Sequence, residues 1–391
     1  MISLDTALRT VMRHARPLGV ETVPLGKAHG RVLARPVASD TDLPPADMSA
    51  MDGYACRRAD LPGPLRVVES VAAGQVARRR VGPGRCVRIM TGAPLPRGAD
   101  TVVMLEDTRE RNGMVYVERI RDNPNVRRRA EDVRRGQVVL RPGTLLTPPC
   151  VAVLAAVGRY RVPVFRRPRV AVIATGDELV EPRRRPGPGQ IRNSNGPQLC
   201  AQVTDCGAVP TYIGIARDTP EALLRALRRA AAASDVVVLS GGVSAGDHDH
   251  VRPALRRAGV RMHFESIAIK PGRPTVFGTR GKRAFFGLPG NPVSTFVLFE
   301  SLVRPYLCAL MGLRHSARRY RGVLAEEVRR RKTDRTELRP VAVGADGSVA
   351  GVAYHGSAHI HAYTVADGFI TVRPGVERIA RGVPVEVTLL R

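Results

Sequence analysis

Between residues 168 and 311 the sequence alternates strand-length apolar segments with segments of helical periodicity. Four runs rich in apolar and β-branched residues predict buried strands, at 169–174, 209–215, 235–239 and 284–288. Helices are predicted between them at 197–206, from Thr219-Pro220 onward and at 253–258, with a long apolar helix after the last strand at 292–310. The segment 261–269 is expected to be an outlying strand. Such alternation predicts a parallel, doubly wound α/β sheet.

The residues on either side of this unit show different sequence patterns. Residues 37–133 consist of short β-like runs separated by Gly and Pro, which predicts a β-rich inserted domain without long helices. Residues 1–36 and 134–166 hold helical and extended pieces and are predicted to form one discontinuous linker domain. Residues 167–312 form the α/β unit, and 313–391 alternate like a small barrel or sandwich. At about 150 residues per domain, 391 residues fit such a multidomain α+β and α/β protein.

The formal net charge of +27 raises the question of nucleic-acid binding. Lysine occurs only at four positions, so the charge is almost entirely arginine, and its runs are scattered. The chain has no Trp, and no basic run carries interleaved aromatic residues for base stacking. We therefore expect a solvated arginine-rich surface and no nucleic-acid partner, although the charge excess favours attraction of small polyanions.

Cysteine spacing and hydropathy indicate in which cellular compartment the protein is expected. The six cysteines never form a CxxC pair, which favours free, buried thiols over disulfides or a zinc site. The longest uninterrupted apolar run, residues 150–157, is too short to cross a bilayer, and an acid at Asp5 argues against a secretory signal. The expectation is a cytoplasmic protein with no membrane partner.

The predicted sheet brings four polar segments together. Ligands bind at the carboxyl ends of the strands in open α/β sheets. The segments that follow the four strands are TGDE at 175–178, Arg217-Asp218, SGGVSAGDHD at 240–249 and LPGNP at 288–292. If the strands are parallel, all four segments line one crevice.

The residue types in this crevice are suited to a phosphorylated ligand. Gly241, Gly242 and Gly246 allow backbone N–H groups to approach an anion, and Asn291 with Pro292 opens a helix whose N-terminus favours negative charge. Four acids accompany them in an otherwise basic protein: Glu178, Asp218, Asp247 and Asp249. Acids beside a phosphate site predict Mg²⁺ between them, whereas each acid taken alone is equally a turn or cap residue.

Other motifs narrow the class of protein. Histidines at 248, 250, 355, 359 and 361 lack metalloprotease spacing, and we expect them to be structural. The absence of GxGxxG, Walker and GxSxG motifs disfavours dinucleotide enzymes, P-loop NTPases and α/β-hydrolases.

Six motifs taken together resemble those of the molybdopterin molybdenumtransferases, the family of bacterial MoeA and of the C-terminal domain of gephyrin. They are DMSAMDGYA at 47–55, IMTGA at 89–93, ATGDEL at 174–179, SGGVSAG at 240–246, IKPGRP at 269–274 and GLPGNPVS at 287–294. The resemblance runs in order along the whole chain.

The resemblance implies four domains, the last a small β-barrel, in an elongated homodimer. The active cleft would lie between the pterin-binding α/β domain of one subunit and the β-rich insertion of the other. The implied reaction is insertion of molybdenum from molybdate into adenylylated molybdopterin, with Mg²⁺-dependent cleavage of the pyrophosphate bond and release of AMP. Implied partners are the molybdopterin adenylyltransferase that supplies the substrate and the molybdoenzymes that receive the product.

The resemblance also assigns residues. Asp52, Glu178, Asp218 and Asp249 would hold the metal, Thr91 would supply a hydroxyl, and Lys270 would pair with substrate phosphate. Substrate-binding positions implied by the motifs are Thr175, Gly176, Gly241, Gly242, Ser244, Gly246, Arg273, Pro289, Gly290, Asn291, Pro292, Asp132, Arg339 and Ser357.

Three departures from the family pattern stand out. Ser266 replaces a lysine that many members carry four residues before Lys270, Ala130 replaces a glycine, and His250 replaces an aromatic residue. Arg273 is a candidate substitute for the missing lysine.

Three alternatives to an active transferase stay open. They are a pterin-binding accessory or scaffold protein, an arginine-rich nucleic-acid binder, and the enzyme that adenylylates molybdopterin. The last would need neither the insertion nor the C-terminal domain.

Overall fold

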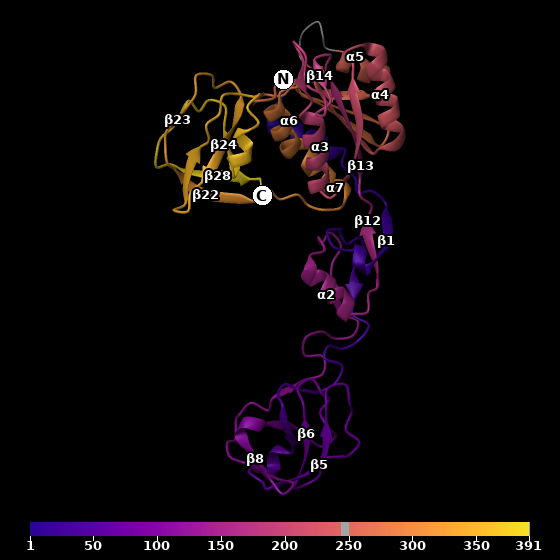
Figure 1. Ribbon diagram of the computed structural model, residues 1–391, viewed down its shortest axis with the longest axis vertical. Coiled ribbons are helices and arrows are strands. Elements are labelled where there is room, and N and C mark those ends of the chain that lie inside the picture. The colour runs from indigo at the N-terminus through magenta and orange to yellow at the C-terminus, as the bar shows by residue number, and fades with distance from the viewer. Residues whose placement is uncertain (244–249, 391) are drawn as a thin grey trace.

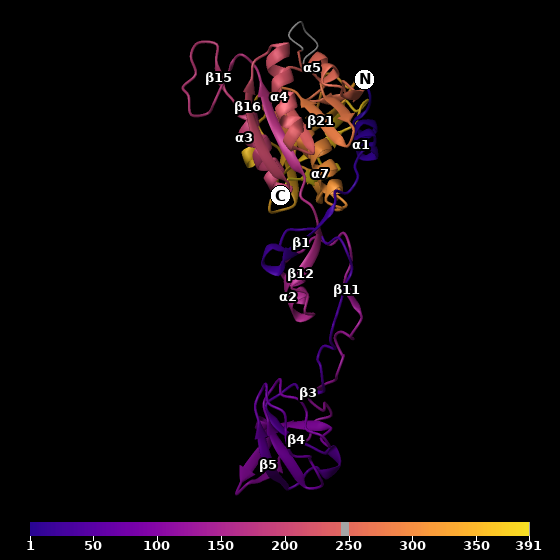
Figure 2. The same cartoon turned by 90° about the vertical axis from the view of Figure 1, so that its right-hand side faces the viewer.

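The protein is elongated, and its two ends are different domains. The structure, a computed structural model, describes residues 1–243 and 250–390. The α/β domain and the C-terminal domain form one end, the β-rich domain forms the other, and a narrow linker joins them (Figures 1 and 2).

The α/β domain is built on a six-stranded mixed sheet of order β16-β13-β17-β21-β20-β18. The four predicted strands are parallel, namely β13 (Arg169–Thr175), β16 (Val209–Ala216), β17 (Val236–Ser240) and β21 (Arg283–Leu288). The prediction of an all-parallel sheet was wrong at one edge, where β20 (Val276–Arg280) runs antiparallel to both of its neighbours, β21 and the edge strand β18 (Arg261–Phe264). A two-residue turn at Gly281-Lys282 reverses the chain there, and Gly281 supplies the positive φ of 57° that the turn requires.

Alternate residues of the central strands pack into two separate hydrophobic cores, one on each face of the sheet. Val170 and Val172 face α1 (Leu4–Arg13), α3 (Asn195–Asp205) and the helical run α6 (Pro292–Leu298), η4 (Phe299–Val303) and α7 (Arg304–Leu310). Ala171 and Ile173 face α4 (Pro220–Ala233) and α5 (Val251–Arg257). The period-2 alternation of a strand places these neighbours on opposite faces, so both faces are covered as the doubly wound prediction requires.

The run from Pro292 to Leu310 is 19 residues long and apolar enough to cross a bilayer. In the structure 72% of its apolar window is buried, with Phe299, Leu302 and Leu307 fully enclosed. Its apolar character is therefore explained by its place in the protein core.

The β-rich domain is a six-stranded sheet of order β7-β4-β6-β5-β9-β8. Its strands are β4 (Gly53–Cys56), β5 (Leu65–Val71), β6 (Arg85–Ile89), β7 (Thr101–Met104), β8 (Thr108–Arg111) and β9 (Met114–Val117). Ala55 and Val87 pack into one apolar cluster, and Tyr54 and Cys86 pack into another. As expected, residues 37–133 hold no α-helix, only the short 3₁₀ turns η2 (Arg58–Asp60) and η3 (Leu105–Asp107).

The linker is built from two distant stretches of chain. β1 (Val20–Pro24) pairs with β12 (Arg161–Phe165), and β2 (Val37–Ala38) pairs with β11 (Val138–Leu140). The helix α2 (Pro148–Ala156) has Pro148 at its first position, and Gly158, at a φ of 73°, follows its C-terminus. The segment 4–13, assigned to the linker from sequence, instead packs Ala7 and Val11 into the α/β core.

Residues 319–389 contain the predicted barrel. Five strands close into a ring in the order β24-β25-β22-β28-β26, with β26 returning to β24. They are β22 (Arg319–Leu324), β24 (Thr336–Val343), β25 (Ser348–Gly351), β26 (Gly368–Val372) and β28 (Pro384–Leu389). The expected outlying strand at 261–269 ends at Phe264, because β19 (Ile269–Lys270) leaves that sheet and pairs with β24. This pairing ties the barrel to the α/β domain.

Candidate functional site

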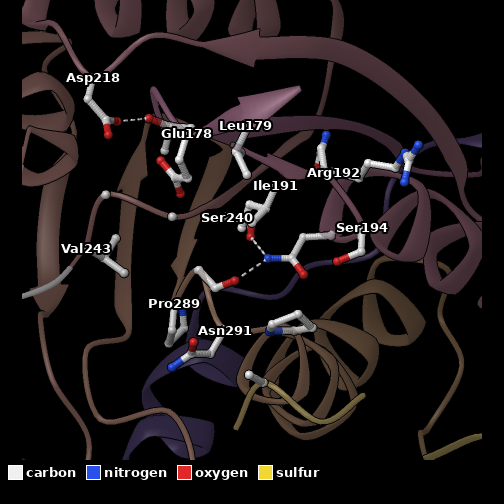
Figure 3. A pocket seen from close by; sticks show the side chains of 18 of the residues that line it. Glu178, Leu179, Ile191, Arg192, Ser194, Asp218, Ser240, Val243, Pro289 and Asn291 are labelled. Carbon is white, nitrogen blue, oxygen red and sulfur yellow. Dashed lines mark hydrogen bonds between the residues drawn. The ribbon is translucent and has the colours of Figure 1, made fainter. Parts of the chain in front are cut away.

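A cavity of about 520 Å³ lies at the carboxyl ends of the four parallel strands (Figure 3). We call it the first cavity. Each of the four predicted segments contributes to its lining: Thr175 and Glu178, Asp218, Ser240 to Gly242, and Pro289 to Pro292. The predicted convergence of these segments is therefore what the structure shows.

Two carboxylates stand side by side at one end of this cavity. The Thr175 hydroxyl donates a hydrogen bond to Asp218, and the backbone N–H of Asp218 donates to Oδ1 of Asp177 at 3.3 Å. Glu178 folds back over Gly176, where an added Cβ would lie 2.5 Å from its Oε2. Neither Glu178 nor Asp218 has a Lys or Arg within ion-pair distance in the described part of the chain, so their charge is available to a ligand.

The loops after β13 and β17 touch backbone to backbone beneath the cavity. Gly241 has a φ of 99°, and a Cβ there would lie 2.2 Å from the carbonyl oxygen of Thr175. Gly242 has a φ of 62° and lies against Thr175 and Val251. Part of the predicted site lies outside the described residues. This part comprises the predicted site residues Ser244, Gly246 and Asp249, together with Asp247.

Sequence reasoning missed Asn195, which also lines the first cavity. Its Nδ2 donates to Ser240 Oγ and to the Gly290 carbonyl, both at 2.7 Å, which fixes the orientation of the amide. The side chain is 8% exposed, and Oδ1 has no hydrogen-bond partner within residues 1–243 and 250–390. The sequence Asn-Ser-Asn at 193–195 could have indicated the start of this helix. The helix was instead predicted to begin at Pro197, two residues after its observed start at Asn195.

A second cavity of about 550 Å³ adjoins the first and shares Pro274, Pro289 and Asn291 with it. It lies between the loop after β19 and the barrel. Besides Pro289 and Asn291, four further predicted residues line it: Lys270, Arg273, Arg339 and Ser357. Asn291 begins α6 as predicted, but its side chain makes no capping bond and lines both cavities instead.

The second cavity is predominantly cationic. Lys270, Arg273, Arg335 and Arg339 line it, and Glu337 is the single acid among the described residues of its lining. Lys270 Nζ lies 3.3 Å and Arg339 Nε 3.8 Å from Oε1 of Glu337, whose side chain is 8% exposed. Cations therefore outnumber acids by four to one, which favours an anionic ligand.

Three predicted residues lie elsewhere in the chain. Asp52 and Thr91 flank β4 and β6 in the β-rich domain, at the opposite end of the molecule (Figures 1 and 2). Oδ1 of Asp52 accepts bonds from the Thr91 N–H at 2.6 Å and hydroxyl at 2.8 Å, and these hold the pKa of Asp52 below its usual value. Asp132 follows β10 (Val126–Arg127) and pairs with Arg127.

Three family models match consecutive parts of the chain. They are the "MoeA N-terminal region (domain I and II)" at residues 2–158, the "Probable molybdopterin binding domain" at 171–309 and the "MoeA C-terminal region (domain IV)" at 321–390. Together they leave only short connecting segments unmatched. The chain belongs to the molybdopterin molybdenumtransferase family. Its class is thus a transferase of molybdenum cofactor biosynthesis, and the resemblance inferred from the motifs is confirmed.

Relatives and solved structures agree with this assignment. A molybdopterin molybdenumtransferase from Nostoc is 41% identical over 304 residues, covering 75% of this chain and 70% of that protein. Molybdopterin molybdenumtransferase 2 of Mycobacterium tuberculosis is 36% identical over 394 residues, covering 96% of each. The crystal structure of the molybdopterin biosynthesis MoeA protein from Pyrococcus horikoshii matches with a TM-score of 0.87 and 33% identity, over 100% of this chain and 99% of that one.

The extent of the matches also argues against the alternative that this chain adenylylates molybdopterin. An enzyme that adenylylates molybdopterin would need neither the insertion nor the last domain, yet both regions of this chain match MoeA family models. The adenylylating alternative is therefore disfavoured.

Proposed function

We propose that this chain inserts molybdenum from molybdate into adenylylated molybdopterin, with Mg²⁺-dependent release of AMP, as a cytoplasmic homodimer. The observation that carries the proposal is a pair of adjoining cavities, one with an excess of acidic side chains and the other with an excess of basic ones. The first presents Glu178 and Asp218, which make no ion pair with a described residue, together with Arg192, and the second is lined by four cations. The proposed reaction has two substrates, adenylylated molybdopterin with its pyrophosphate and molybdate as a separate oxyanion. Acidic side chains would hold the metal ion at the pyrophosphate, and basic side chains would bind the oxyanion.

The first cavity fits Mg²⁺ by the chemistry of its donors. Mg²⁺ prefers carboxylate and phosphate oxygen and keeps several waters, so two protein carboxylates are a sufficient protein contribution. Glu178 and Asp218 would hold the ion, and no group of three or more His, Cys, Asp or Glu side chains in the described ranges offers an alternative cage. Bound there, Mg²⁺ would neutralise charge on the pyrophosphate.

The chain's own residues orient the reacting groups. Thr175 fixes one oxygen of Asp218, which leaves the other directed to a ligand. Gly241 and Gly242 bring backbone close to the anion, and the Asn195 amide, fixed by Ser240 and Gly290, ties the loops after β17 and β21 together at the cavity wall. Lys270 and Arg273 supply positive charge to phosphate or molybdate in the second cavity.

A homodimer accounts for the distance of Asp52 and Thr91 from both cavities. Within one chain they flank β4 and β6, which lie at the end of the elongated molecule opposite the α/β domain (Figures 1 and 2). A second copy arranged antiparallel would bring its β-rich domain to the first chain's cleft. Asp52, held ionised by Thr91, would then complete the set of acids.

The direct test is AMP release from purified adenylylated molybdopterin in the presence of Mg²⁺ and molybdate, followed by activation of a cofactor-free molybdoenzyme. We expect stoichiometric AMP and activation, with no AMP once Mg²⁺ is chelated. Tight binding of substrate without AMP would contradict the proposal and favour a scaffold protein.

The same assay addresses Ser266, which does not line either cavity, whereas Arg273 does. We expect Arg273 to serve in place of the family lysine. AMP release without activation would indicate poor molybdate capture, and Ser266→Lys would then restore activation.

A further prediction concerns Glu337, which competes with an oxyanion for Lys270 and Arg339. Glu337→Gln keeps the shape but removes the charge, so the cavity becomes more positive. We expect the KM for molybdate to fall about threefold at low ionic strength, and the difference to shrink at high salt. The control is Glu386→Gln, which breaks a surface pair with Arg319. A raised KM in Glu337→Gln alone would mean that Glu337 positions the two cations instead.

A further inference from the structure

A third cavity, of about 920 Å³, lies at the opposite edge of the same α/β sheet, where the parallel strands begin. We call it the basal cavity. Its walls come from the chain after α1, the entry to β13, the entry to β17, the turn between β20 and β21, and α7. Neither the motifs nor the proposed reaction assigns it a role.

Six cationic side chains line the basal cavity: Arg13, Arg16, Arg166, Arg169, Lys282 and Arg283. Asp235 is the single carboxylate among the described residues of this lining, and both of its oxygens already accept hydrogen bonds. Arg166 donates to both of its oxygens, at 2.8 and 3.0 Å, and the Arg169 N–H donates to Oδ2 at 2.8 Å. The wall therefore carries a surplus of about five positive charges that its own acid cannot balance.

Four of these six cations have no acidic partner in the described part of the chain. Arg13, Arg16, Lys282 and Arg283 make no ion pair with any residue that the structure describes. Other arginines of this basic chain, at 78–80 and 183–185, are also unpaired among the described residues, but the four named here line one cavity. Unpaired cations here surround a hollow, where like charges repel unless an anion lies between them.

Several of these cations are held in place. Arg166 is clamped by the two oxygens of Asp235, Arg283 Nε donates to the Ser234 carbonyl at 3.2 Å, and Arg16 Nη1 donates to the Ala15 carbonyl at 2.9 Å. Fixed guanidinium groups bind phosphate with less loss of side-chain entropy than free ones do.

The shape favours a small ligand over nucleic acid. A volume of about 920 Å³ is within the usual range of small-molecule pockets. Tyr306, the tyrosine in the lining, is 1% exposed and cannot stack on a base. One monoanion would leave most of the positive charge unbalanced.

We propose that the basal cavity binds a compact polyanion made of linked phosphoryl groups, with at least three negative charges. The site is separate from the cleft. β13 and β21 begin at the basal cavity, at Arg169 and Arg283, and Asp235 lies there directly before β17. The three strands end at the cleft, at Thr175, Ser240 and Leu288. Six residues of extended chain, about 20 Å, separate the two sites, so their ligands do not compete.

The test is calorimetric titration of the full chain with inorganic triphosphate at low ionic strength. The variant Arg16→Glu/Lys282→Glu replaces two exposed cations of the wall, and the control Arg228→Glu/Arg321→Glu replaces two exposed arginines outside every cavity described above. Both remove two positive charges and add two negative ones, so the net charge falls from +27 to +23 in each. We expect one triphosphate per chain, affinity at least about tenfold weaker in the wall variant, and a change below about twofold in the control.

Further titrations identify the ligand and separate this site from the cleft. Equal affinity for ATP and triphosphate would indicate that the site recognises the phosphoryl chain alone. Tighter binding of ATP would indicate that the site also contacts the nucleoside. AMP release by the wall variant tests the cleft independently. The proposal is overturned if wild-type protein does not bind triphosphate, if the control loses as much affinity as the wall variant, or if only duplex DNA binds.

Discussion

Glu178→Gln and Asp52→Asn are each expected to lower the rate of AMP release by at least about 100-fold without loss of folded structure. Each change keeps the size of the side chain but removes the negative charge that a metal or a developing charge requires, and losses of this size follow removal of one such group. Both residues are exposed, so their contribution to folding is small. Single-turnover AMP release, with circular dichroism and urea unfolding as checks on folding, measures the effect.

Mixing the two variants tests whether the cleft is shared between subunits. A mixed dimer has one cleft with both substitutions and one cleft with neither, because Asp52 would come from the partner of the chain that supplies Glu178. Random re-association makes about half of the dimers mixed, so we expect about a quarter of wild-type activity to return.

The matched control mixes Glu178→Gln with Asp218→Asn. These residues line the same cavity of one chain, so every cleft in the mixed dimer carries one substitution, and no activity should return. If the first mixture stays inactive although mixed dimers form, the shared cleft is wrong.

The sequence predicts the part of the fold in which local pattern and burial coincide. β13 and β17 carry unbroken apolar runs, at 170–174 and 236–239, because helices cover both faces, so they stand out from the alternating strands elsewhere. Once those strands are recognised, the convergence of Glu178, Asp218 and Ser240 follows from parallel topology alone. The edge hairpin of β20 was missed because its turn, Gly281-Lys282, is short and carries little sequence signal.

The unpredicted parts of the site depend on contacts between distant segments. Glu337 meets Lys270 because β19 pairs with β24 across a separation of 67 residues, which no local pattern encodes. Asn195 is placed by bonds to Ser240 and Gly290, residues of two other loops. The amphipathic pattern of α1 shows which of its faces is buried but does not identify the domain that covers it.

Gly241→Ala is expected to destabilise the α/β domain and abolish AMP release. Alanine would have to adopt a φ near 99°, and its Cβ would lie 2.2 Å from the carbonyl oxygen of Thr175, so the loops after β13 and β17 must separate. Because Thr175 holds Asp218, the separation would also displace a carboxylate of the first cavity. We expect the free energy of unfolding to fall by about 2–4 kcal/mol.

The matched comparison is Gly290→Ala in the neighbouring loop, where among the described residues an added Cβ meets only the Cα of Gly241, at an ordinary 3.6 Å. Its free energy of unfolding should stay within about 0.5 kcal/mol of the wild-type value. Urea unfolding of the two variants side by side therefore separates the effect of a methyl group in this region from the effect of the backbone contact at Gly241. Equal stability of the two variants would show that the loops after β13 and β17 can move apart freely, and that their close approach does not fix Thr175 and Asp218 in the cleft.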